Sequence, residues 1–350
     1  MKRPTSTLRN ILLFSASFLL FYGISQAGAV ADETLMHNCL LRILLQAEDS
    51  MTAGEMKAAC EEELRNPTQE AEDVTDAVLE TPLDERLAKE EEAAFGNLWT
   101  ITPHKRNYLL LANYNFSSMN NGPFIESSEA DIDLNNTEAK FQISFKFMLL
   151  ENLSRKYTNG DLYFAFTQMS MWQVYSSDIS SPFRDTNFEP EIFFSFDNDW
   201  DIFGFKNRLN YFGIVHQSNG RSGELSRSWN RLFATFIFNR NNFALALKAW
   251  WRIPEDKDDD DNPDIHQYLG YGELRLAYKW GNQTFDLMWR NNLDFDENRG
   301  AVELGWTFPL PGTDRIKGYV QYFNGYGQCL LDYKASSSTI GAGFLLTDWY

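Results

Sequence analysis

Three polar residues that lie close together in the chain could carry out nucleophilic catalysis. His216 and Ser218 are two residues apart in an alternating stretch, so in a β-strand both side chains point to the same face. A hairpin centred near residue 223 would place Asn230 of the next strand opposite His216. Ser218 is then the candidate nucleophile, and His216 is the base that takes its proton. Asn230 would accept a hydrogen bond from the imidazole and fix its tautomer, as an aspartate does in other triads.

The hairpin face that carries these three residues is otherwise apolar. Phe212 and Ile214 precede His216 on it, and Leu232 follows Asn230. Unpaired polar groups are costly where a strand meets lipid, so polar residues at such positions need a reason. The spacing alone leaves two reasons open: a hydrolytic site, or a cluster at a barrel rim that binds lipid headgroups. Neither a G-x-S-x-G nor an H-E-x-x-H motif occurs, which argues against soluble serine hydrolases and zinc proteases.

From about residue 96 onward, apolar and polar residues alternate along short segments that Gly, Asn and Asp separate. Phe141, Ile143 and Phe145, for example, are separated by single polar residues. This period of two predicts β-strands, and an even number of them is typical of single-chain outer-membrane barrels. The twelve segments are 105–116, 141–149, 160–174, 187–197, 206–218, 228–240, 242–252, 274–280, 283–292, 302–308, 315–326 and 338–350.

The composition favours a membrane barrel over a soluble β-sandwich. The 350 residues include 10 Trp, 15 Tyr and 28 Phe, yet the mean hydropathy is only −0.41. Aromatic residues crowd one strand face, as an interfacial girdle requires, and the other face carries charges of both signs. The sequence therefore predicts an all-β fold, a 12-stranded antiparallel transmembrane β-barrel whose interior is filled by paired charges rather than open. These charges include Lys146, Glu273, Arg275, Lys279, Asp286, Arg290 and Glu303.

The N-terminal residues have the features of a targeting signal. Lys2, Arg3 and Arg9 form a basic region, and the apolar run 11–24 that follows is short for a membrane span. An A-x-A pattern at residues 27–29 predicts cleavage there, so residues 1–29 are assigned to a signal peptide. No other window has 18 consecutive apolar residues, so we expect no transmembrane helix in the mature chain.

Residues 30–95 are predicted to form an acidic, helical periplasmic extension before a barrel domain at residues 96–350. Between residues 32 and 95 there are 18 acidic and 5 basic residues, and the run 90–92 is expected to be solvated. Cys39 and Cys60 could close a helical hairpin through a disulfide, or they could be free thiols. The whole chain has a net charge of −18 and no basic stripe, which excludes a nucleic-acid partner.

A periplasmic N-terminus would make the odd-numbered strands run outward. The connections near residues 175–186, 219–227 and 253–267 then lie at the cell exterior, so the candidate site faces the outer leaflet. The acidic run from Asp256 to Asp264 lacks the glycine and distal glutamate of an EF-hand loop, and it is expected to be a solvated exterior loop.

Residues 216–222 (HQSNGRS), followed by residues 226–231 (SRSWNR), resemble the active-site hairpin of bacterial outer membrane phospholipase A. Several further motifs keep the family's order and spacing, so the resemblance extends from about Asn97 to Tyr350. These motifs are residues 180–184, 187–190, 261–264, 325–327 and 331–333.

The resemblance implies a calcium-dependent enzyme of the bacterial outer membrane, a phospholipase A1/A2. Such an enzyme hydrolyses the sn-1 and sn-2 acyl esters of phospholipids and lysophospholipids through a triad that falls here on Ser218, His216 and Asn230. The family is active as a reversible homodimer whose interface holds the acyl chains, and a glutamine of that interface falls on Gln168.

By the same resemblance, the calcium ligands fall on Ser180 of one subunit and on the Arg221 carbonyl and Ser226 of the other. Asparagine carries no charge, so bound Ca²⁺ would supply the electrostatic stabilisation that the oxyanion needs. The family often has an acidic residue where this chain has Gly223, with Glu224 next, which leaves any ligand role of that acid open.

Two other classes of protein remain compatible with the residues. A non-enzymatic structural or channel-forming barrel could use the cluster of His216, Ser218 and Asn230 to bind lipid headgroups. A soluble exported β-protein would also alternate, but it would not require detergent for extraction. Reaction of the serine with a sulfonyl fluoride distinguishes a nucleophile from a headgroup ligand.

Overall fold

The computed structural model describes residues 57, 60, 81–94, 99–121, 133–151 and 160–348. The chain divides into two compact units, Met1–Leu79 and Glu80–Tyr350. In the first unit Cys60 is disulfide-bonded. Its predicted partner Cys39 lies outside the described residues, as does the predicted signal peptide, so the pairing and the cleavage site stay predictions.

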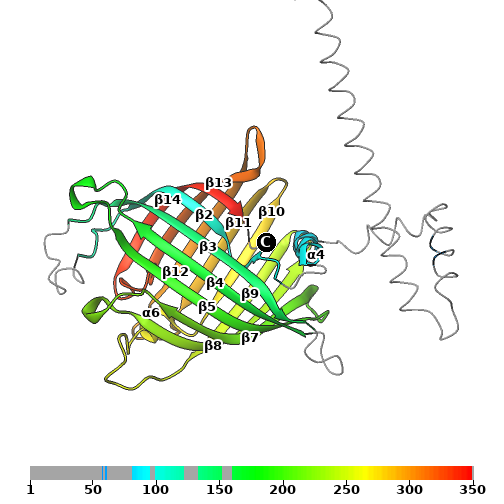
Figure 1. Ribbon diagram of the computed structural model, residues 1–350, viewed down its shortest axis with the longest axis horizontal. Coiled ribbons are helices and arrows are strands. Elements are labelled where there is room, and N and C mark those ends of the chain that lie inside the picture. The colour runs from blue at the N-terminus through cyan, green and yellow to red at the C-terminus, as the bar shows by residue number, and fades with distance from the viewer. Residues whose placement is uncertain are drawn as a thin grey trace, which may run out of the picture. The chain divides into compact units, whose positions relative to one another are not determined.

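Twelve long strands of the described residues form a closed antiparallel barrel (Figure 1). Each strand pairs with the next long strand along the chain, and β14 pairs with β2 to close the circle. The predicted twelve-stranded barrel is therefore confirmed. The strands are β2 (Asn107–Asn115), β3 (Thr137–Leu150), β4 (Gly160–Trp172), β5 (Phe183–Asp197), β7 (Phe205–Ser218), β8 (Ser228–Arg240), β9 (Phe243–Arg252), β10 (Gly272–Trp280), β11 (Gln283–Asn291), β12 (Gly300–Leu310), β13 (Thr313–Tyr326) and β14 (Ser336–Thr347).

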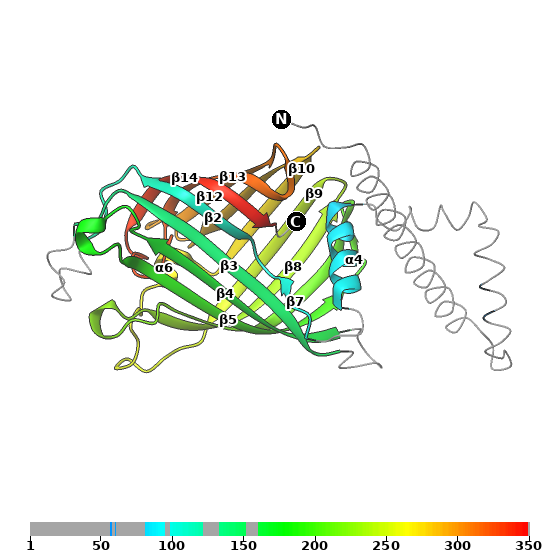
Figure 2. The ribbon, with the colours of Figure 1, turned by 45° about the horizontal axis from the view of Figure 1, so that its top comes forward.

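The short elements lie at the barrel ends. The two-residue strands β1 (Thr102–Pro103) and β6 (Asp201–Ile202) pair with β3 and β7. The connections after β4, β7 and β9 lie together at one end, opposite helix α4 (Figure 2). They contain η1 (Ser177–Ile179), η2 (Gly223–Leu225) and α6 (His266–Leu269).

Strand β5 begins at Phe183, four residues before the predicted position 187. The additional residues resemble a loop in sequence, but their inward side chains point into the barrel. Arg184 is buried there and donates to both carboxylate oxygens of Glu138, at 2.9 and 2.7 Å. It also pairs with Asp332. A charged stretch can extend a strand when its inward side chains find such partners, and hydropathy alone does not indicate this.

The two faces of the barrel wall differ as the alternation predicts. Along β8 every second residue from Trp229 to Asn239 is buried, and the residues between them are more exposed. Large apolar side chains on the outer face remain exposed, including Phe212, Ile214 and Leu232. Such a surface gains stability where hydrocarbon covers it.

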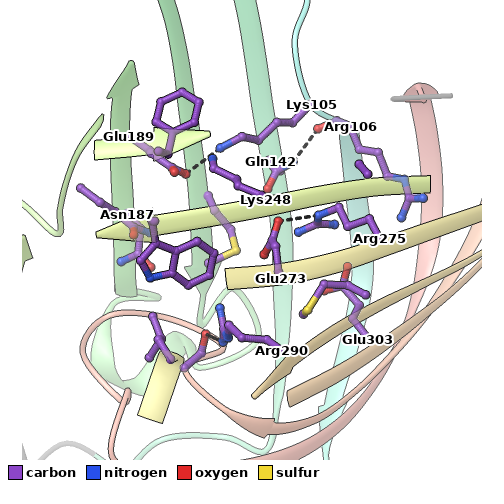
Figure 3. Close-up of a pocket in the computed structure, with 18 of the residues that line it drawn as sticks. Lys105, Arg106, Gln142, Asn187, Glu189, Lys248, Glu273, Arg275, Arg290 and Glu303 are labelled. Atoms are coloured by element: carbon purple, nitrogen blue, oxygen red, sulfur yellow. Dashed lines mark hydrogen bonds and ion pairs between the residues drawn. The ribbon is translucent and has the colours of Figure 1, made fainter. Parts of the chain in front are cut away.

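Inside the barrel, charged side chains of opposite sign pair with one another (Figure 3). Lys105 Nζ lies 2.8 Å from Glu189, and Arg275 Nε lies 2.8 Å from Glu273. Lys248 pairs with Glu191 at 3.1 Å. The interior is filled in the predicted way, and a cavity of about 260 Å³ remains.

Helix α4 (Pro82–Ala94) lies at the barrel end opposite the loops that contain η1 and α6 (Figure 2). Leu83 packs in a cluster with Leu209 and Ile237 from the barrel wall. Glu90 pairs with Lys146 of β3 at 2.9 Å, so the expectation of a solvated charge at this residue is wrong. Although α4 lies within the predicted extension 30–95, it belongs to the same compact unit as the barrel.

Among the described residues, no helix has the length and apolar character needed to cross a membrane.

Candidate active site

The hairpin of β7 and β8 brings the predicted triad residues to one face. In its register His216 is opposite Asn230, and Ser218 is opposite Ser228, as the hairpin prediction required. His216 is exposed, and Ser218 and Asn230 are half-buried. The site therefore opens on the outer wall of the barrel and away from its lumen.

A chain of hydrogen bonds passes through Asn230. His216 Nδ1 lies 2.9 Å from Asn230 Oδ1, and Asn230 Nδ2 donates to Glu255 Oε1 at 2.9 Å. Sequence patterns do not single out Glu255, because it lies 25 residues beyond Asn230, in the loop after β9. The hairpin of β8 and β9 could have indicated the contact, because it brings the end of β9 back beside Asn230.

Ser218 lies beside this pair on the same strand face. Among the described residues no hydrogen bond joins Ser218 to His216. Catalytic hydrogen bonds are often long in a ligand-free site and shorten when substrate binds. The structure therefore places the three predicted residues together and shows a contact between the predicted base, His216, and its predicted orienting residue, Asn230.

The loop after β7 is held by a buried asparagine. Asn219 donates from Nδ2 to the Leu225 carbonyl at 2.8 Å. Its Oδ1 accepts from the backbone N–H groups of Arg221 at 3.3 Å and Arg227 at 3.0 Å. Gly223 adopts a φ of +62°, a left-handed conformation that glycine adopts without strain. The loop that carries two predicted calcium ligands thus has a defined backbone.

The predicted calcium ligands lie on two loops at the same barrel end. Ser226 Oγ donates to Asp261 Oδ2 at 2.6 Å, so a carboxylate from the loop after β9 lies beside this ligand. The Arg221 guanidinium donates to the carbonyls of Phe183 and Arg184, which joins its loop to the start of β5.

Ser180, the ligand predicted for the other subunit, is exposed at the end of η1 with a φ of 62°. Within the described part of the chain, no cluster of three or more His, Cys, Asp or Glu residues could hold a metal.

The acidic loop after β9 is only partly solvated. Residues 256–259 are exposed, as predicted. Asp260 instead pairs with Arg252 at 2.5 Å, and Asp264 pairs with Lys334 at 3.0 Å and accepts from Tyr333. Burial opposes ionisation of Asp264, but Tyr333 and Lys334 outweigh it and hold the pKa of Asp264 below its ordinary value. For Asp260 and Asp264 the expectation of a solvated loop is wrong.

Gln168, the predicted dimer residue, lies on the outer face of β4. Its neighbours in register are Ile143 and Phe188, so its surroundings are largely apolar. The side chain is half-buried, and Nε2 donates to Ser170 Oγ at 3.2 Å. Gln168 therefore has one partner within its own chain, and its place in a dimer interface stays a prediction.

Comparison with known proteins identifies the family. The model of the phospholipase A1 family matches residues 83–346, which include the barrel and most of α4. The chain belongs to the phospholipase A1 family. The family member from Proteus vulgaris is 35% identical over 254 residues, which are 73% of this chain and 84% of that protein.

Solved structures of family members match the barrel. An asparagine-to-alanine active-site mutant of outer membrane phospholipase A from Escherichia coli is 32% identical, with a TM-score of 0.67, over 73% of this chain and 95% of that one. The outer membrane phospholipase of Salmonella typhi, a dimer with bound calcium, is 32% identical with a TM-score of 0.67, over 74% of this chain and 97% of that one. The family resemblance is confirmed, and the chain is an outer-membrane phospholipase.

Proposed function

We propose that this phospholipase is a calcium-dependent A1/A2 enzyme that hydrolyses sn-1 and sn-2 acyl esters of phospholipids and lysophospholipids. Ser218 is its nucleophile, His216 its base and Asn230 the residue that orients His216. The observation that carries the proposal is the 2.9 Å contact between His216 and Asn230 on the outer face. The existence of an asparagine-to-alanine active-site mutant of the E. coli protein supports a role for asparagine in this family.

The first half of the reaction forms an acyl-enzyme. Ser218 Oγ attacks the ester carbonyl carbon while its proton passes to His216 Nε2, the nitrogen that Asn230 leaves available. The tetrahedral intermediate then expels the glycerol oxygen, which takes the proton from His216 and leaves as a lysophospholipid. In the second half, water loses a proton to His216 and attacks the acyl carbonyl carbon. The bond to Ser218 Oγ then breaks, the fatty acid is released, and Ser218 Oγ takes the proton back from His216.

The apolar wall beside the triad is suited to acyl chains. Phe212 is 40% exposed, Ile214 45% and Leu232 47%, and all three lie on the face of His216 and Asn230. A phospholipid whose chains lie along this wall would present its ester bonds near the barrel rim, where the triad is. Contact with apolar side chains alone does not distinguish the two ester positions, which agrees with hydrolysis at both.

The oxygen atoms near Ser226 fit a calcium ion. Ca²⁺ prefers hydroxyl, carbonyl and carboxylate oxygens, and the Ser226 hydroxyl already lies 2.6 Å from the Asp261 carboxylate. Ser226 and the Arg221 carbonyl would hold the ion together with Ser180 of a second subunit. When bound there, Ca²⁺ would supply positive charge near the developing oxyanion.

We propose further that the active form is a homodimer with its site toward the outer leaflet. A shared metal requires Ser180 of one barrel to meet the loop of Arg221 and Ser226 on another. The half-buried Gln168 amide would be covered by the same contact. The dimer with bound calcium in the S. typhi relative supports this arrangement.

Hydrolysis of phospholipid in mixed detergent micelles tests the proposal. The protein should release fatty acid with calcium and lose this activity on chelation, and Ser218→Ala should be inactive while the barrel remains folded. Activity of Ser218→Ala near the starting value would remove this serine from the mechanism. Absence of hydrolysis by a folded, calcium-loaded dimer would instead favour a structural or channel-forming barrel.

A further inference from the structure

The hydrogen bonds of Asn230 end on a carboxylate that the reaction above does not use. Glu255 Oε1 lies 2.9 Å from Asn230 Nδ2, and Asn230 Oδ1 lies 2.9 Å from His216 Nδ1. We infer that Glu255 is a positioning residue, which fixes the orientation of the Asn230 amide and, through it, the tautomer of His216. This inference rests on the proposed function, because it assigns a role within the same site.

The direction of each hydrogen bond follows from the three chemical groups. An ionised carboxylate can only accept, so Asn230 must turn its Nδ2 donor toward Glu255. The amide oxygen then faces His216 and can only accept, so Nδ1 of His216 must carry the proton. Nε2 is left without a proton and can act as the base. Without the carboxylate, the amide could turn over and donate to Nδ1, which would place the imidazole proton on Nε2.

Glu255 also supplies the negative charge that an asparagine lacks. His216 becomes positively charged when it takes the proton of Ser218, and an aspartate in the place of Asn230 would stabilise that charge directly. Here the Glu255 carboxylate lies one side chain further from the imidazolium, with Asn230 between them. Glu255 is half-buried, so solvent weakens the attraction without removing it.

The loop that carries Glu255 is fixed to the catalytic strand at both ends. The Ile253 N–H donates to the Asn230 carbonyl at 2.8 Å, so the first residue of the loop is hydrogen-bonded to the backbone of the catalytic asparagine. Further along, the fully buried Asn262 accepts from the Ser228 N–H at 2.9 Å. This arrangement holds the Glu255 side chain against Asn230 before substrate arrives.

The neighbouring charged groups on this loop and on the connection after β7 have partners of their own. These contacts are Arg252 with Asp260, Asp261 with Ser226, and Arg221 and Arg227 with backbone carbonyls. Asp258 and its neighbours at 256, 257 and 259 are exposed. In the described part of the chain, Glu255 is the carboxylate that contacts the triad.

The first test removes the carboxylate and keeps its size. Glu255→Gln should lower kcat about fivefold with little change in KM, because the amide of Asn230 loses its fixed orientation. The acidic limb of the kcat/KM profile should move to lower pH by about half a unit, because the imidazolium loses a stabilising charge. Asp258→Asn is the matched control: it removes one charge from the same loop and should leave both quantities unchanged.

The decisive test repeats Glu255→Gln in an Asn230→Asp background. A carboxylate at position 230 accepts from Nδ1 in either orientation, and Glu255 would repel it and raise its pKa. Glu255→Gln should therefore raise kcat about fivefold in this background, opposite in sign to its effect with Asn230 present. A loss of activity in both backgrounds would show that Glu255 only maintains the loop, and would overturn the inference.

Ser218→Ala separates this inference from the proposed function. Hydrolysis that persists in Ser218→Ala refutes the proposed nucleophile, whatever Glu255 does. If Ser218→Ala is inactive and Glu255→Gln equals Asp258→Asn in kcat and in pH profile, the proposed function stands and the role given to Glu255 is wrong.

Discussion

In the proposed mechanism, replacing Asn230 with Ala removes the residue that orients the base but leaves the base, His216, in place. The substitution eliminates the 2.9 Å hydrogen bond to His216 Nδ1. A hydrogen bond to a group that becomes charged contributes about 1.5–3 kcal/mol, and exposure of this pair favours the lower end. About 1.5 kcal/mol corresponds to a loss of roughly tenfold in kcat. His216→Ala removes the base, so we expect a loss of about a thousandfold or more.

Initial rates of ester hydrolysis in mixed micelles at saturating calcium measure both losses. Heat-dependent gel migration of each variant shows whether the barrel is folded. Both variants should be folded, because strand pairing and burial of the outer face in lipid or detergent do not depend on either side chain. Equal losses in the two variants would refute the reasoning, because an orienting residue cannot be worth as much as the base it orients.

Three further predictions concern calcium, the dimer and helix α4. Asp261→Asn should raise the calcium concentration needed for half-maximal activity about tenfold without lowering the maximal rate, because one anionic oxygen beside the proposed calcium site is removed; a calcium titration measures this. Gln168→Ala should lower the dimer fraction in cross-linking at fixed calcium, with a roughly fivefold weaker association from the loss of about 1 kcal/mol of hydrogen bonding; an unchanged fraction would remove Gln168 from the interface. Burial opposes ionisation of Glu90, but Lys146 and Arg86 outweigh it and hold the pKa of Glu90 below its ordinary value of 4.5. The ion pair therefore stabilises α4 above pH 4.5 and breaks as the pH falls through the lowered pKa. The protection of α4 amides against hydrogen exchange, relative to their intrinsic rates, should therefore fall below about pH 4.5, and in Glu90→Gln it should be low already at neutral pH.

The barrel and the triad hairpin could be predicted because both depend on a period of two. Alternation assigns each side chain to the lumen or the outer wall, and the short connection between β7 and β8 determines that His216 faces Asn230. The start of β5 could not be predicted in this way, since Arg184 is a polar residue whose partners, Glu138 and Asp332, are distant from it in the sequence. The expectation for Glu90 fails for the same reason: a charged residue on a helix is expected to be solvated until its partner Lys146 is known.

Glu255 shows the limit of prediction from sequence within the site itself. Its role depends on the path of a loop, and loop paths follow from individual contacts, such as that of Ile253 with the Asn230 carbonyl, rather than from a repeated pattern. Glu255 adjoins the acidic run 256–264, and a carboxylate in such a run is normally expected to be solvated, so the sequence gives no reason to single it out. The family resemblance does not indicate it either, since none of the motifs that carry the resemblance includes residue 255.

Mass-spectrometric mapping of a sulfonyl fluoride adduct tests the central claim most directly. We predict that the calcium-loaded protein acquires one adduct, on Ser218, that hydrolysis falls in proportion to labelling, and that His216→Ala labels much more slowly. An adduct on a different serine, or full hydrolysis by protein that is fully labelled at Ser218, would contradict the assignment of Ser218 as the nucleophile.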